Sequence, residues 1–165
     1  MSKVLLILHV LAAVIAVGPV TVAGSMFPAA VRKAAAAPDK PESVGAVRLL
    51  HRICRVYAGV GLAVPVFGFA TASSMHVLGS AWLIVSIVLT GVAAIVLALL
   101  VLPAQEIAIA GLNGSGSGSG ADADTATRIE PAQIRRLAML TGTFNLLWAT
   151  VTILMIVRPG SSTGA

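Results

Sequence analysis

The chain has 165 residues, of which 58% are hydrophobic and 10% charged, and its mean hydropathy is +0.98. Soluble domains carry roughly 25% charged residues, so this composition indicates an integral membrane protein and excludes secreted disulfide scaffolds and soluble enzymes. The net charge of +5 arises from eleven Lys and Arg, nine of which lie in two segments between apolar stretches. That distribution is typical of membrane topology rather than of nucleic-acid binding.

Four apolar stretches are long enough to cross a bilayer, whose hydrocarbon core of about 30 Å needs roughly 20 residues of helix. They span residues 4–27, 56–75, 81–103 and 137–157. The first is longer than the apolar region of a cleaved signal peptide, so we expect it to be retained. The sequence predicts one all-α domain, a polytopic four-helix transmembrane bundle.

The basic residues predict the orientation of this bundle. The segments between spans one and two and between spans three and four hold nine of the Lys and Arg, so both are expected in the cytoplasm, with both termini outside the plasma membrane. Residues 28–55 are predicted as a loop that includes a basic helix at 44–55. Residues 104–130 are predicted as a flexible loop that contains a Gly/Ser linker at 113–120.

The basic helix places Arg48, Arg52 and Arg55 on one face, at spacings of four and three residues. Such a stripe can bind anionic lipid headgroups, or it can form a solvated collar that does no more than set the topology. We also expect His51, beside this stripe, to contact headgroups.

The inward faces of the spans are predicted from small and polar residues, because helices in membranes associate through close packing and hydrogen bonds. On the fourth span this stripe is polar and consists of Thr141, Asn145, Trp148 and Thr152. An amide in hydrocarbon is costly, so Asn145 is expected to bond across the bundle. The alternative is that it binds a quinone, a haem or a lipid headgroup.

A second candidate site lies near the outer leaflet. His9, Met75, His76 and Met155 are expected at similar depth, and His and Met suit copper(I) or a b-type haem iron. The alternative is that the histidines are hydrogen-bonded packing residues and the methionines fill gaps.

Catalytic chemistry finds no support in the sequence. The four predicted spans contain no Asp, Glu, Lys or Arg, which argues against an ion-coupled transporter or pump. Phosphate-binding loops, nucleophile elbows and zinc-protease motifs are also missing from the sequence, so we predict no enzyme and no catalytic residues. Cys54 is the single cysteine, which excludes an intrachain disulfide.

Several apolar segments resemble a known family. They read LLILHVLAAVIAVGPV, VGLAVPVFGFA, WLIVSIVLTG, LVLPAQE and RRLAMLTGTFNLLWATVTILMIVRPG. This pattern is similar to an actinobacterial family of four-helix integral membrane proteins of unknown function, distantly like copper-resistance D-type membrane proteins. The resemblance implies a plasma-membrane bundle with a metal or haem connection through His9. The chain lacks the Met- and His-rich soluble segments that copper handling would favour.

Three functional hypotheses follow. The first is an accessory or scaffold subunit that binds a partner membrane protein or a second copy of itself, in contact with membrane lipids and without nucleic acid. The second is a haem- or copper-binding membrane protein that uses His9 and His76, assisted by Met75 or Met155. The third is a small lipid or quinone carrier, or a permeation path along Pro65 and Asn145.

Overall fold

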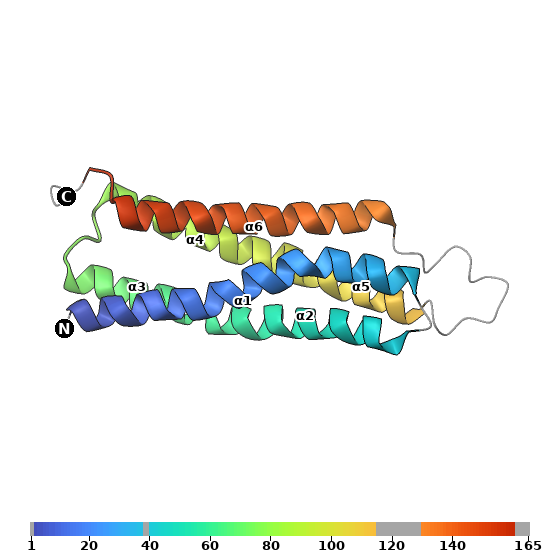
Figure 1. The fold of residues 1–165 in the computed structure, drawn as a ribbon. Helices are drawn as coiled ribbons and strands as arrows, with labels where there is room; N and C mark the ends of the chain where they lie inside the picture. Colours follow the sequence, from blue (N-terminus) through green and yellow to red (C-terminus); the bar gives the residue numbers. More distant parts are fainter. Residues whose placement is uncertain (1, 38–39, 115–129, 161–165) are drawn as a thin grey trace.

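The computed structural model describes residues 2–37, 40–114 and 130–160, and this part of the chain is all-α. The elements are α1 (Ser2–Ala36), α2 (Pro41–Val60), α3 (Ala63–Ser74), α4 (Ala81–Ile95), the π-helical segment η1 (Val96–Val101), α5 (Leu102–Gly114) and α6 (Pro131–Val157). α3 continues α2, and α5 continues α4 through η1. Together with α1 and α6 they form four long helical rods, numbered here in chain order, that lie side by side (Figure 1). Residues 115–129, which hold most of the predicted Gly/Ser linker, lie outside the described part.

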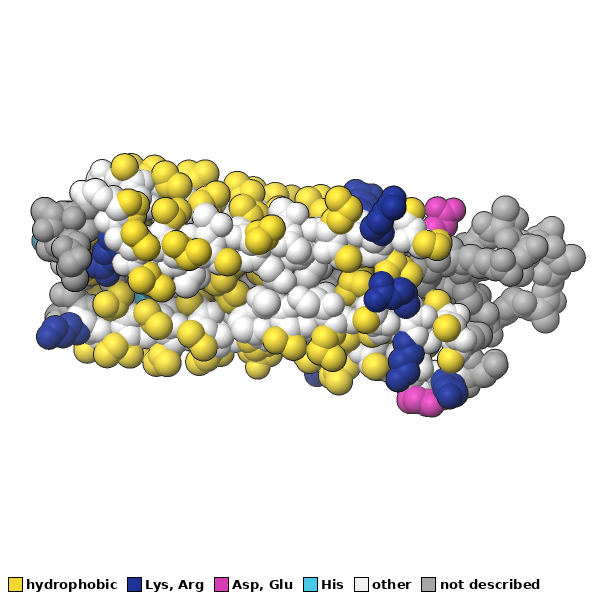
Figure 2. All heavy atoms as spheres, turned by 45° about the horizontal axis from the view of Figure 1, so that its top comes forward, with side chains coloured by type: hydrophobic (Ala, Val, Ile, Leu, Met, Phe, Trp, Pro, Cys, Tyr) yellow, Lys and Arg dark blue, Asp and Glu magenta, His cyan; other side chains and the backbone are white. Residues whose placement is uncertain are grey.

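Four helices are long and apolar enough to cross a membrane, in agreement with the prediction of four spans. They extend over Lys3–Ala36, Pro41–Ser74, Ala81–Asn113 and Pro131–Val157. The first turn of α1 and the last turn of α6 lie at the same end of the bundle (Figure 1). Most of the Lys and Arg visible in Figure 2 gather toward the opposite end.

The helices continue well beyond the apolar stretches. Much of the segment expected as a loop over 28–55 is helical, since α1 ends at Ala36 and α2 begins at Pro41, and α5 continues to Gly114. The physical reason is that hydropathy detects the part of a helix that lies in hydrocarbon. The alanine-rich segment 29–36 after the first apolar stretch has high helix propensity and prolongs α1 beyond that stretch.

Proline shapes the second rod. Pro65 has no N–H, so the carbonyl of Gly61 cannot receive the usual helical hydrogen bond. Instead the N–H of Val64 donates to that carbonyl at 3.1 Å, and the N–H of Leu62 donates to Gly59 at 3.1 Å. These tight turns separate α2 from α3 at Gly61 and Leu62.

The π-helical segment η1 keeps one face of the third rod buried. The buried residues Ala93, Leu97, Val101 and Gln105 follow each other at intervals of four. In an ideal α-helix, at about 100° per residue, three such steps would drift by about 120° around the axis. The wider π turn reduces this drift, so η1 allows Gln105 to face the interior.

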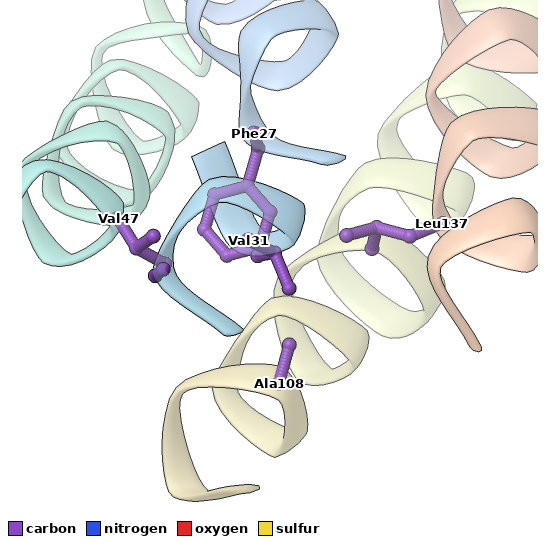
Figure 3. Close-up of a cluster of buried hydrophobic side chains, with 6 residues drawn as sticks. Phe27, Val31, Val47, Ala108 and Leu137 are labelled. Atoms are coloured by element: carbon purple, nitrogen blue, oxygen red, sulfur yellow. The ribbon is translucent and has the colours of Figure 1, made fainter. Parts of the chain in front are cut away.

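The core consists of three layers of buried apolar side chains along the bundle. The layer near the α1–α2 connection draws residues from all four rods (Figure 3): Phe27, Val31, Ala34, Val47, Ala108 and Leu137. The middle layer contains Val20, Ala93, Leu97, Val101 and Phe144, and the layer at the other end contains Ala72, Trp82 and Leu83. Many other large apolar side chains are exposed, as expected for a surface that faces lipid.

Candidate functional site

Asn145 forms the cross-bundle hydrogen bond that the sequence predicts. Its Nδ2 donates to Ser25 Oγ of α1 at 3.1 Å. Its Oδ1 is buried and has no hydrogen-bond partner among the described residues, and the same holds for Oγ1 of Thr141, one helical turn away. Thr141 is 4% exposed. A buried polar atom without a partner costs about 1–3 kcal/mol, so two of them on one face of α6 indicate a missing partner.

Both oxygen-bearing side chains line a hollow of about 230 Å³ between α1 and α6, which we call the α1/α6 crevice. Its lining consists of Ser25, Pro28, Ala29, Arg32, Ala138, Thr141, Gly142 and Asn145. The two helices approach closely beside it, because a Cβ added to Gly24 would lie 3.0 Å from Thr141 Cγ2.

The sequence creates this crevice in a simple way. Ala29, Ala138 and Gly142 have too little side chain to fill the space between the helices. Pro28 has no N–H, so the Gly24 carbonyl loses its helical donor. The lining therefore combines small apolar walls with the hydroxyl of Thr141, the amide of Asn145 and the cationic, exposed side chain of Arg32. Such a site can bind a molecule that carries hydrogen-bonding oxygens.

A second hollow, of about 300 Å³, differs in construction. Its lining residues all belong to α6: Ala132, Arg135, Arg136, Met139, Leu140 and Thr143. Because no second helix contributes to it, we regard it as a dent in the surface of α6 rather than a site between helices.

His9 lies at the contact between α1 and α3. Its Nδ1 is 2.9 Å from the carbonyl oxygen of Val64, and because a carbonyl can only accept, this nitrogen carries the proton. The ring lies against Gly68, where an added Cβ would be 3.0 Å from His9 Cε1. In the neutral ring Nε2 then keeps its lone pair, and no described residue bonds to it. His9 thus packs two helices and retains one atom able to bind a metal.

The four residues predicted as an outer-leaflet ligand set lie at two depths. Met75 follows Gly68, the contact of His9, by seven residues, which corresponds to about 10 Å of helix. His76 is exposed, with a φ of 56°, and Met155 packs against the core layer of Ala72, Trp82 and Leu83. The structure therefore does not bring His9 next to Met75 and His76. Among the described residues, no group of three or more His, Cys, Asp or Glu is placed to hold a metal.

Sequence reasoning missed a buried polar layer between α2 and α5. Gln105 is fully buried; its Oε1 accepts from His51 Nδ1 at 3.0 Å, and its Nε2 donates to Cys54 Sγ at 3.6 Å. His51 Nε2 lies 3.7 Å from a carboxylate oxygen of Glu106. The expected headgroup residue His51 thus faces another helix. The sequence spacing does not reveal it, because in an ideal α-helix Gln105 would lie about 120° from Ala93 around the axis.

The three arginines of the basic stripe have different surroundings in the structure. Arg48 Nη2 donates to Asn113 Oδ1 at 2.6 Å and so ties α2 to α5. Arg52 and Arg55 are exposed. Headgroup binding by the three arginines stays a prediction.

No family model, curated protein or solved structure shows detectable similarity to this chain. The resemblance to four-helix proteins distantly like the copper-resistance D-type family therefore stays a prediction, and function must be argued from the site.

Proposed function

We propose that this protein is a non-enzymatic membrane protein that binds an amphiphilic small molecule in the α1/α6 crevice. The supporting observation is that Thr141 and Asn145 line the crevice and each carry a buried oxygen that has no hydrogen-bond partner among the described residues. At about 230 Å³, the space is smaller than the roughly 300–1,000 Å³ of pockets that enclose a drug-sized ligand. It suits one ring or one head group, with the apolar tail left in the bilayer.

We further propose that both termini lie outside the plasma membrane, in keeping with the concentration of Lys and Arg in the two inter-span segments. In this orientation Arg32 and Arg136 lie near the cytoplasmic surface, because α1 ends and α6 begins at that end of the bundle. The crevice then opens in the cytoplasmic half of the membrane.

Fewer structural observations support the other two functional hypotheses. An accessory-subunit role would use the exposed apolar faces of the helices, which a lipid bilayer covers equally well, so it stays a prediction. Haem or copper binding would use Nε2 of His9, and it too stays a prediction.

The test compares the native amphiphile content of three purified proteins. We expect full-length protein, extracted in mild detergent, to carry one amphiphile per chain in native mass spectrometry. Thr141→Val removes the hydroxyl with little change of shape and is expected to lose most of the bound molecule, as is Asn145→Leu. Thr150→Val is the matched control, because the Thr150 hydroxyl already donates to the Leu146 carbonyl at 2.8 Å and is exposed.

Circular dichroism establishes that each variant keeps its helices. A wild-type protein without any bound amphiphile would contradict the proposal. Equal amphiphile content in Thr141→Val and Thr150→Val would contradict it as well.

A further inference from the structure

We infer that the ligand of the α1/α6 crevice is a quinone-type ring, bound in both its oxidised and its reduced form. This inference rests on the proposed function and names the chemical class of its ligand. It concerns binding alone and includes no transfer of electrons or protons.

The depth of the unpartnered oxygens favours a ring over a phospholipid headgroup. Asn145 follows Arg136 by nine residues, or about 13 Å along the helix axis. Half of the hydrocarbon core measures about 15 Å, so the Asn145 amide lies close to the bilayer centre when Arg136 is at the surface. Phosphates and ester groups stay near the surface. A ligand that brings carbonyl or hydroxyl oxygens to this depth needs an otherwise apolar frame, which a quinone ring provides.

The hydrogen-bonding groups of the crevice suit both redox forms. A hydroxyl can donate or accept, so the bond between Asn145 and Ser25 persists whether the amide presents its oxygen or its nitrogen to the crevice. The first orientation accepts a hydrogen bond from a quinol hydroxyl, and the second donates one to a quinone carbonyl. The hydroxyl of Thr141 has the same freedom.

Arg32 distinguishes this ligand from a phosphate-bearing lipid. It follows Ser25 by seven residues, which places it about 10 Å nearer the end of α1. A lipid phosphate would depend on the guanidinium as its cationic partner. A ring bound at Thr141 and Asn145 would not.

Trp148 offers a direct probe of the site. It is half-buried and follows Asn145 by three residues, so the two share a face of α6. The chain contains two tryptophans, and Trp82→Phe leaves Trp148 as the single emitter. A quinone ring bound in the crevice is therefore expected to quench Trp148 fluorescence.

The experiment titrates ubiquinone-1 into full-length Trp82→Phe protein in detergent, and into the same protein with Thr141→Val, Asn145→Leu or Thr150→Val added. We expect saturable quenching that ubiquinol-1 reverses by competition. Its Kd should rise at least tenfold in Thr141→Val and Asn145→Leu and stay within twofold in Thr150→Val. Non-saturable quenching, or an equal Kd in Thr141→Val and Thr150→Val, would overturn the inference.

The outcomes separate this inference from the proposed function. If native mass spectrometry finds a phospholipid that both Thr141→Val and Arg32→Gln release, while quinone quenching is non-saturable, the quinone inference fails and amphiphile binding stands. If no amphiphile copurifies and ubiquinone-1 does not saturate, both fail.

Discussion

The contact between His9 of α1 and Gly68 of α3 allows a quantitative test of the packing. A Cβ at Gly68 would lie 3.0 Å from His9 Cε1 and 3.2 Å from Nδ1, whereas non-bonded carbon atoms prefer about 3.5–4.0 Å. The ring cannot retreat freely, because its Nδ1 is bonded to the Val64 carbonyl at 2.9 Å. Gly68→Ala therefore forces an overlap or weakens this hydrogen bond.

The expected magnitude follows from three contributions. Overpacking a fitted site costs about 1–3 kcal/mol, and an interhelical hydrogen bond in a membrane contributes about 0.6 kcal/mol on average. Replacing glycine by alanine within a helix raises the free energy of unfolding by about 0.5–1 kcal/mol. Gly68→Ala should thus lower the free energy of unfolding by about 0.5–3 kcal/mol in the wild type. In a His9→Ala background the clash is gone, and the same change should raise it by about 0.5–1 kcal/mol.

The assay is a double-mutant cycle, with unfolding by SDS in mixed micelles followed through helical circular dichroism. Gly59→Ala is the matched control, because an added Cβ at Gly59 meets no atom within 4 Å, and it should be neutral or stabilising in both backgrounds. The coupling between His9 and Gly68 should reach about 1.5–3.5 kcal/mol. A coupling below about 0.5 kcal/mol, the level seen for independent sites, would refute the reasoning.

Three further predictions use the same unfolding assay. Gln105→Ala should lower the free energy of unfolding by about 1–3 kcal/mol, because the buried contact with His51 is lost; an equal effect in a His51→Ala background would contradict this account. Gly24→Ala should cost about 1 kcal/mol through its clash at the crevice, whereas Gly18→Ala, where an added Cβ meets no atom within 4 Å, should not; equal effects would refute the close approach. His76→Gly should stabilise by about 1 kcal/mol, because the φ of 56° at His76 disfavours a residue with a Cβ; a loss of stability would instead reveal favourable contacts of the imidazole.

The sequence alone determined that four helices are long and apolar enough to cross a membrane. The physical reason is local, because a lipid-exposed backbone must satisfy its own hydrogen bonds and a long apolar run can do so only as a helix. The cross-bundle bond of Asn145 was also predictable, since an amide among apolar residues needs a partner. The helix ends were not predictable in this way. Hydropathy marks only the part of a helix that lies in hydrocarbon, whereas helix propensity can prolong the helix beyond it.

Tertiary structure decided which polar groups meet. The π turn of η1 sets the rotation of α5 and so allows Gln105 to face His51. The contact of His9 with Gly68 places His9 at a different depth in the bundle from Met75. The two unpartnered oxygens of Thr141 and Asn145 become visible only when α1 lies against α6. Composition and helical spacing assign residues to faces, but the distance between two helices depends on the side chains of both, and that distance creates the crevice.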